Sequence, residues 1–168
     1  MKNIIEKYNL SLFLGPLPVI CTSVTSMNEL FSKSPFHIHC HPFPNYEKMF
    51  PLEKKLPEKL NLYICSPEQN IWPTRDFLKD LVKNSLYLVG MEGFVYLGNN
   101  YKELIFDVGC ILSPAYCFGK DRVLCDNDDE EAQIPYCTTG GNTLGIGYSR
   151  TAPAVLQKGE KILFGSVF

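Results

Sequence analysis

The sequence lacks an excess of charge of either sign, and it lacks a long apolar run. Lysine and arginine together number 16 against 18 aspartates and glutamates, which gives a formal net charge of −2. A chain with this balance has no surplus of basic residues to neutralise a phosphate backbone or an anionic bilayer. No uninterrupted apolar run approaches the roughly 18 residues that a membrane-spanning helix needs. We therefore expect no nucleic-acid partner and no membrane association.

The first residues also lack the features of a secretory signal. Glu6, Lys7 and Asn9 interrupt the continuous apolar core that such a signal requires. We therefore expect a soluble protein that stays in the cytoplasm.

The cysteines lack the spacing of a metal site. There are seven of them, an odd number, and no two form a Cys-x-x-Cys pair, which argues against both a closed disulfide framework and a zinc ribbon. The simplest expectation is free, buried thiols. The alternative, for an exported protein, is one or two disulfide bridges among Cys110, Cys117, Cys125 and Cys137.

What the chain does have is the size and composition of one packed globule. A chain of 168 residues buries about two-thirds of its unfolded surface when it folds. Its mean hydropathy of −0.05 fits neither a disordered chain nor a membrane protein. No repeat or linker divides the sequence, so we expect residues 1–168 to form a single globular domain.

The spacing of apolar residues, together with the positions of proline, glycine and capping residues, predicts helices mainly in the first half of the chain and strands mainly in the second. The expected helices cover residues 2–13, a segment that starts at Ser26 and ends before Pro35, and residues 73–84 with an apolar stripe of Phe77, Leu78, Leu81 and Val82. The expected strands cover residues 36–43, 60–65, 86–89, 94–97, 103–112, 121–125 and 160–168, with a hairpin loop at 90–93. This order predicts an α+β fold with a largely antiparallel sheet and two or three short helices packed on it.

All three histidines lie at alternate positions of one short segment, at His37, His39 and His41. On a strand they would share one face, where two imidazoles could bind a transition metal such as zinc, with a carboxylate completing the ligand set. Glu47, Glu53 and Asp107 are the possible carboxylate donors. The alternative is a plain solvated sheet face, with Ile38 and Cys40 pointing into the core.

The same segment resembles the motif of the histidine-triad nucleotide hydrolases and transferases over seven residues. In that family the central histidine attacks a phosphorus centre, and the matching residue here is His39. The resemblance thus implies a catalytic role for His39 in a small hydrolase or phosphoesterase.

Two further segments could bind ions but lack the required spacing. Residues 125–131 carry five carboxylates, yet Glu131 stands where a helix-loop-helix calcium site needs glycine, so we interpret them as a solvated acidic loop. Residues 138–147 are rich in glycine without a phosphate-loop pattern, and we interpret them as turns and a bulged strand.

Three segments in chain order resemble the bacterial suppressor-of-fused-like domain family. Residues 60–67 followed by 72–81 are similar to the strand, turn, Trp-Pro pair and helix of that family, and residues 37–44 and 106–114 each resemble a strand that ends in proline. The resemblance covers residues 36–114. It implies an α+β protein-binding module without catalysis, of the kind found among immunity proteins that bind and neutralise a toxin.

The sequence therefore leaves two hypotheses of different classes. The first is a non-enzymatic, immunity-protein-like domain without a cofactor that binds another protein. Its contact surface would come from apolar side chains in the proline-rich loop 43–57, namely Phe43, Tyr46, Met49 and Phe50. The second is a small metal-dependent or histidine-based hydrolase that uses His37, His39 and His41 with a divalent metal such as zinc.

Overall fold

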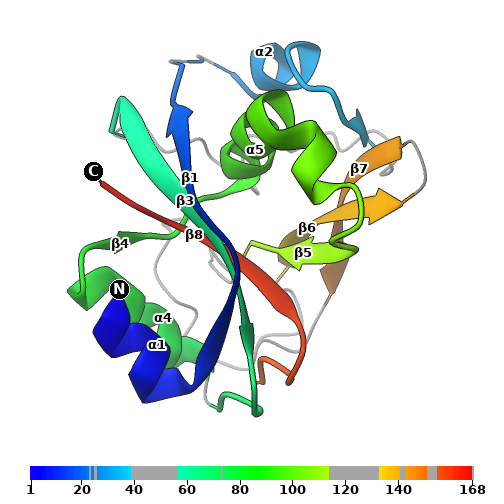
Figure 1. The fold of residues 1–168 in the computed structure, drawn as a ribbon. Coiled ribbons are helices and arrows are strands. Elements are labelled where there is room, and N and C mark those ends of the chain that lie inside the picture. Colours follow the sequence, from blue (N-terminus) through cyan, green and yellow to red (C-terminus); the bar gives the residue numbers. More distant parts are fainter. Residues whose placement is uncertain are drawn as a thin grey trace.

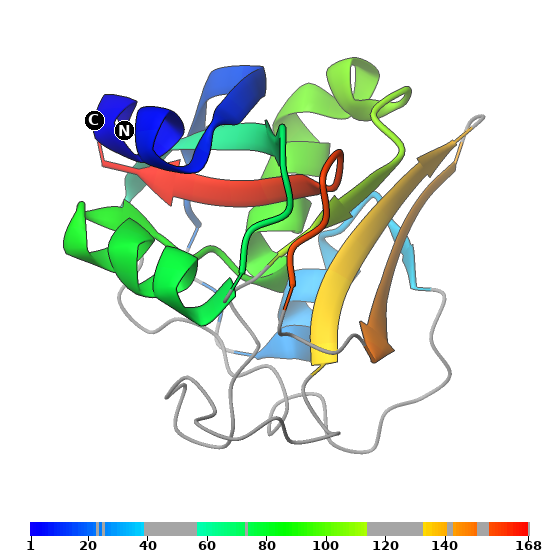
Figure 2. The same ribbon diagram turned by 90° about the horizontal axis from the view of Figure 1, so that it is seen from below.

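The computed structural model describes residues 1–22, 24, 26–38, 57–72, 74–113, 133–140, 143–150 and 155–167. These residues form one mixed sheet with helices on both of its faces (Figures 1 and 2). The helices are α1 (Lys2–Tyr8), α2 (Met27–Ser32), α4 (Thr74–Lys83) and α5 (Met91–Ile105). The strands are β1 (Leu10–Ile20), β2 (His37–Ile38), β3 (Lys59–Pro67), β4 (Leu86–Tyr87), β5 (Cys110–Leu112), β6 (Gln133–Gly140), β7 (Thr143–Arg150) and β8 (Lys161–Ser166).

The strand order is β1-β3-β8-β5-β6-β7-β2, and β4 pairs with one end of β8. Most neighbours are antiparallel; β5 with β8 and β2 with β7 are the parallel pairs among the described strands. The predicted α+β class with a largely antiparallel sheet is therefore confirmed.

The sheet separates two clusters of buried side chains, and β3 contributes to both by alternation. Leu62 and Ile64 point to the face covered by α2 and α5, whereas Tyr63 and Cys65 point to the face covered by α1 and α4. The larger cluster, under α2 and α5, consists of Leu17, Val19, Leu30, Phe36, Leu60, Leu62, Ile64, Val89, Met91, Phe94, Val95, Tyr96, Leu97, Ile105, Val108, Ile111, Cys137, Leu144, Ile146 and Leu163. The smaller cluster, under α1 and α4, consists of Ile4, Leu10, Tyr63, Cys65, Ile71, Phe77, Leu78, Leu81, Leu86, Leu156, Ile162 and Phe164.

The helix predicted over residues 2–13 is wrong beyond Tyr8. Asn9 adopts a left-handed conformation (φ 48°, ψ 56°), which asparagine tolerates better than most residues, and it ends α1. Leu10 then begins β1, which pairs antiparallel with β3 along the length of both strands. Strand pairing here outweighs the local helical spacing of apolar residues, because propensity is a weak preference compared with tertiary structure.

The strand β1 forms one edge of the sheet and is shaped by glycine and proline. Gly15 has φ +127°, and a Cβ there would lie 2.8 Å from the Leu62 carbonyl oxygen, so a side chain does not fit. Pro16 and Pro18 follow and remove two backbone donors. The Tyr101 hydroxyl donates a hydrogen bond of 2.6 Å to the Pro18 carbonyl. This half of the edge is therefore poorly suited to pairing with another strand.

The helix α5 replaces a predicted loop and two predicted strands. The hairpin loop expected at 90–93 is the start of the helix, and the strand expected at 94–97 is its buried centre. Of the strand expected at 103–112, only Cys110–Leu112 is strand (β5). Every residue from Met91 to Gly98 is buried, so this first half of the helix has no polar face and no amphipathic period to reveal it in the sequence.

The other predicted elements within the described residues are confirmed with small differences. Ser26 caps α2, where its hydroxyl accepts the Glu29 N–H at 3.1 Å. The strand β3, the helix α4 and the strand β8 lie where they were expected, and β4 covers part of the predicted strand 86–89. In the stripe of α4, three members are buried, but Val82 is 58% exposed, because it lies off the face that contacts the sheet.

The glycine-rich residues 138–147 lie in the hairpin of β6 and β7. Its register runs without a shift from Gln133↔Arg150 to Gly140↔Thr143, so the predicted bulge is wrong. The register shifts that do occur are in β1, on either side of Leu14. The strand expected at 121–125 and the acidic segment 125–131 lie outside the described residues.

Candidate functional site

The predicted histidine strand begins at β2, where Phe36 fixes the position of His37. The Phe36 N–H donates to the Ser34 hydroxyl at 3.1 Å, and the Phe36 side chain is 6% exposed. Its ring packs against Gly98 of α5, where a Cβ would lie 2.2 Å from ring carbon Cε2. A glycine at this position of α5 therefore makes room for the residue that precedes His37.

The strand β2 is held at the outer edge of the sheet by parallel pairing with β7. His37 lies opposite Gly145, and Ile38 lies opposite Ile146, whose side chain is buried in the larger cluster. The His37 side chain is exposed. An exposed imidazole at this edge is accessible both to a metal ion and to solvent.

Most of the other predicted site residues lie outside the described residues. This applies to the other two histidines, to two carboxylates and to the loop side chains: His39, His41, Glu47, Glu53, Phe43, Tyr46, Met49 and Phe50. Asp107 is described and is exposed, just after α5. Among the described residues, no three His, Cys, Asp or Glu side chains are grouped as a metal ion would need.

The four described cysteines, Cys21, Cys65, Cys110 and Cys137, are free. This agrees with the predicted free thiols, although Cys110 is exposed rather than buried. Cys110 lies opposite Thr138, whereas Cys137 lies opposite Ile111. Adjacent residues of a strand point to opposite faces of the sheet, so a bridge between Cys110 and Cys137 does not fit this register.

The protonation of these thiols bears on whether one could be a nucleophile. Burial, with a smaller contribution from the Glu92 carboxylate, raises the pKa of Cys21 to about 11. Burial raises the pKa of Cys65 and of Cys137 to about 12. Although the Cys110 side chain is exposed, neighbouring protein atoms partly desolvate its thiol and, with the Glu160 carboxylate, raise its pKa. Because the thiolate is the reactive form, all four are poor nucleophiles at neutral pH.

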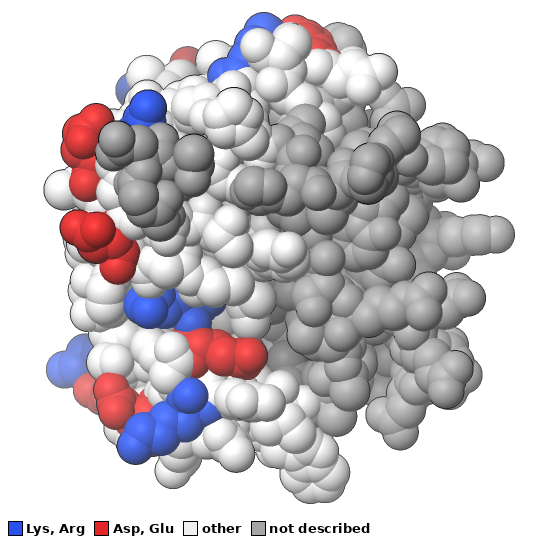
Figure 3. Space-filling model, turned by 90° about the vertical axis from the view of Figure 1, so that its right-hand side faces the viewer, with Lys and Arg blue, Asp and Glu red and all other residues white. Residues whose placement is uncertain are grey.

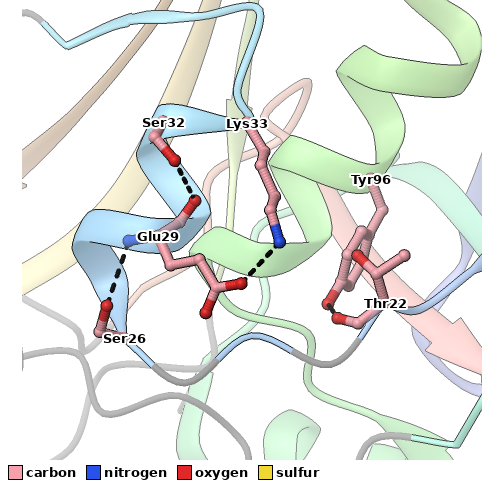
Figure 4. A network of polar contacts seen from close by, with 6 residues as sticks. All are labelled: Thr22, Ser26, Glu29, Ser32, Lys33 and Tyr96. Atoms are coloured by element: carbon pink, nitrogen blue, oxygen red, sulfur yellow. Dashed lines mark hydrogen bonds and ion pairs between the residues drawn. The ribbon is translucent and has the colours of Figure 1, made fainter.

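Polar contacts around α2 and α5 have a structural role (Figure 4). Ser26 caps the first turn of α2, and the Lys33 ammonium contacts the Glu29 carboxylate at 2.6 Å one turn later. The Tyr96 hydroxyl of α5 donates to the Thr22 carbonyl at 2.9 Å. The Tyr96 bond joins the segment after β1 to α5, and the other contacts stabilise α2 itself.

An apolar surface feature that the sequence interpretation missed lies between β3 and α4. Ile71 and Leu156 are buried and exchange two backbone hydrogen bonds, of 2.8 Å and 3.0 Å. This isolated antiparallel bridge places the following Trp72 opposite the preceding Val155. Trp72 is 73% exposed and Val155 is 40% exposed. We call these two side chains the Trp72 patch.

The backbone beneath the Trp72 patch is tied together by two more contacts. The Lys158 N–H donates to the Asn70 side-chain oxygen at 2.8 Å, and the Gly159 N–H donates to the Pro67 carbonyl at 3.0 Å. The patch therefore stands on a fixed backbone. The sequence signal that could have indicated it was the single tryptophan of the chain, followed by proline in a turn between two strong elements.

On the face shown in Figure 3, the described charged residues do not gather into a region of one sign. Basic and acidic side chains alternate over the described part of this face. None of the helices in the described ranges combines the length and the apolarity needed to cross a membrane.

Comparisons with family models, with curated proteins and with solved structures found no match to this chain. The resemblance to the suppressor-of-fused-like family therefore stays a prediction, as does the seven-residue resemblance to the histidine-triad family.

Proposed function

We propose that this chain is a non-enzymatic protein-binding domain, of the immunity-protein type that its family resemblance implies. The observation that carries the proposal is the 73% exposure of Trp72, the one tryptophan of the chain. Tryptophan is among the residues most enriched at the energetic centres of protein interfaces. When a partner covers a ring of this size, a large apolar area is removed from water, which stabilises the complex.

The setting of Trp72 supports a role as an anchor. The Ile71–Leu156 bridge fixes the backbone residue next to each of the two side chains, and Val155 adds apolar surface to the patch. An anchor held in place before binding loses little conformational entropy when it binds. The described backbone thus favours insertion of a ready-placed indole into an apolar hollow of the partner.

Two features suggest what kind of contact the partner makes. Pro16 and Pro18 disfavour the addition of a partner strand to β1, so contact through side chains is favoured over strand pairing. The near balance of 16 basic and 18 acidic residues in the chain favours a contact that depends on shape and apolar area. Binding should accordingly change little with salt, because surplus charge is what salt screens. Phe43, Tyr46, Met49 and Phe50 are proposed as a second contact region.

The chemistry of the described thiols does not support a cysteine nucleophile. Burial raises the pKa values of Cys21, Cys65 and Cys137, so these thiols are not activated at neutral pH.

The test uses the single tryptophan as a probe. A partner is first captured from the source cells and purified, and its Kd for the wild-type chain and for Trp72→Ala is measured by calorimetry. We expect Trp72→Ala to weaken binding about 30-fold or more, as the loss of an interface anchor does. We also expect acrylamide to quench the tryptophan fluorescence of the free chain strongly and that of the complex weakly.

Val82→Ala is the matched control, because Val82 is 58% exposed on the neighbouring helix α4 and lies outside the patch. It should leave the Kd within about twofold, since most exposed contacts contribute little. Equal affinity of the wild-type and Trp72→Ala chains, with unchanged quenching in the complex, would refute the role of Trp72.

A further inference from the structure

The short helices α1 and α4 are joined by one carboxylate. Asp80 of α4 accepts a hydrogen bond of 2.6 Å from the Tyr8 hydroxyl, and the same oxygen contacts the Lys7 ammonium. Its side chain is 17% exposed. Both donors belong to the last turn of α1, so Asp80 attaches the end of α1 to α4 (Figure 1).

Apart from this contact, α1 is weakly held. It has seven residues, Ile4 is its fully buried residue, and no side chain caps its first turn. Helices this short have little stability of their own and depend on tertiary contacts. The other specific contact of the last turn is the Tyr8 ring, which meets the Phe77 ring edge-on with centroids 4.9 Å apart.

The helix α1 closes one side of the smaller cluster. Ile4 belongs to that cluster, and Met1, Ile5 and Tyr8 pack against it. Cys65, 0% exposed, is a member of the same cluster, whereas Cys137, also 0% exposed, belongs to the larger cluster on the other face of the sheet.

We propose that α1 is a lid on the smaller cluster and that it opens while the sheet stays folded. The contacts of Asp80 with Lys7 and Tyr8, which we call the clasp, set how often α1 opens. Segments with few buried contacts open locally, at a lower free energy than the whole molecule. Opening would uncover the apolar surface around Tyr63 and Phe77 without breaking the pairing of β3 with β8.

The charges around the clasp define its range of pH. Hydrogen bonds from Lys7 and then Tyr8 lower the pKa of Asp80, and the Lys83 ammonium contributes as well. The clasp therefore adds stability above the unfolded carboxyl pKa of about 4, and this is lost as the pH falls through the lowered value. Burial and then the contact with Asp80 raise the pKa of Tyr8 to about 12. The hydrogen bond from the Tyr8 hydroxyl to Asp80 is therefore lost only in strong alkali. At neutral pH the clasp is closed.

The two buried thiols allow local opening to be distinguished from unfolding. Burial raises the pKa of each to about 12, so their intrinsic reactivities are matched. Alkylation at neutral pH, followed by peptide mass spectrometry, gives a separate rate for each cysteine. Opening of α1 accelerates Cys65 alone, whereas global unfolding accelerates Cys65 and Cys137 together.

In Asp80→Ala we expect Cys65 to be alkylated about threefold to tenfold faster. This range corresponds to the free energy lost when a partly exposed group gives up its charge-assisted hydrogen bonds. The rate of Cys137 should stay unchanged. Tyr8→Phe keeps the ring on Phe77 and removes one donor, so it should have a smaller effect in the same direction. Hydrogen exchange of residues 2–8 should accelerate in parallel, while that of β3 should not.

Asp76→Ala is the matched control, because Asp76 is an exposed carboxylate one turn earlier on α4 that does not take part in the clasp. It should leave both alkylation rates as they are in the wild-type chain. Equal acceleration of Cys65 and Cys137 in Asp80→Ala would mean general destabilisation and would overturn the proposal. Unchanged rates of both would overturn it too, because Asp80 would then not control α1.

Discussion

The two clusters on opposite faces of the sheet are built in different ways. The larger cluster is organised around α5, whose first eight residues are all buried. The smaller cluster is covered by α1 and α4, which keep a polar, solvent-exposed side. This difference shows why the sequence predicted one half of the molecule better than the other. An amphipathic helix carries its own periodic signal, whereas a helical segment buried on every side, such as Met91–Gly98, does not.

The largest expected effect comes from removing a ring at the centre of the larger cluster. Phe94 is 0% exposed, and Phe94→Ala should lower the free energy of unfolding by about 3–5 kcal/mol in chemical denaturation. Leu81 of the smaller cluster is also 0% exposed, and Leu81→Ala should lower the free energy of unfolding by about 2–5 kcal/mol. Each value includes the lost transfer free energy and the cavity that remains.

Neighbouring exposed residues provide the controls for both changes. Leu104 of α5 is 55% exposed and Val82 of α4 is 58% exposed, so Leu104→Ala and Val82→Ala should each cost less than about 0.5 kcal/mol. We expect a single transition in every variant, because β3 and β8 are shared by both clusters. A two-step transition in Leu81→Ala would instead show that the smaller cluster unfolds by itself.

A smaller effect is expected at the contact between α5 and the start of the histidine strand. A Cβ at Gly98 would lie 2.2 Å from the Phe36 ring and 3.0 Å from Pro35, so Gly98→Ala must displace a buried ring. Overpacking of this kind outweighs the higher helix propensity of alanine, and we expect a net loss of about 1–2 kcal/mol.

Asn99→Ala is the control for Gly98→Ala, because Asn99 is the next residue of α5 and is exposed. It should change stability by less than about 0.5 kcal/mol. If Gly98→Ala instead stabilises the protein, Phe36 can move at little cost, and α5 does not position His37.

The sequence predicted those elements that carry their own boundary signals. Ser26 and Glu29 form a capping pair that locates α2, and the apolar stripe of Phe77, Leu78 and Leu81 locates α4. The end of α1 at Asn9 was missed, because the pairing of β1 with β3 is a long-range contact that local spacing does not contain. The helix α5 was predicted as a loop and strands for a different reason, because its first eight residues are all buried and give no amphipathic period.

The candidate site was predicted less well than the fold. Trp72 was noted only as part of the Trp-Pro pair of the family resemblance, because its exposure depends on the Ile71–Leu156 bridge between segments 85 residues apart. Whether a side chain such as Trp72 is exposed is a property of the assembled fold. The alternation of His37 and Ile38, by contrast, follows from strand geometry alone, and the exposed His37 fits it.

The smallest expected effect concerns two of the histidines, His37 at the edge of the sheet and His39. If they form a plain sheet face, His37→Ala and His39→Ala should each change the free energy of unfolding by less than about 1 kcal/mol. Phe36→Ala, one residue before His37, should cost about 3–5 kcal/mol, because its ring is buried against α5. Such a difference between neighbouring residues would show that β2 is held in place by the preceding Phe36 and not by the histidines.

Metal analysis of the same proteins, purified without an affinity tag, separates the two functions. We expect no stoichiometric metal in the wild-type chain or in either histidine variant. A zinc site held by His37 and His39 would behave differently, since two remaining donors rarely hold zinc against water and buffer. Each single change would then remove metal and activity together while leaving the fold intact. Stoichiometric zinc, iron or manganese in the wild-type chain, lost in His39→Ala, would therefore make a hydrolase the better explanation, and Trp72 would have to be explained by something other than partner binding alone.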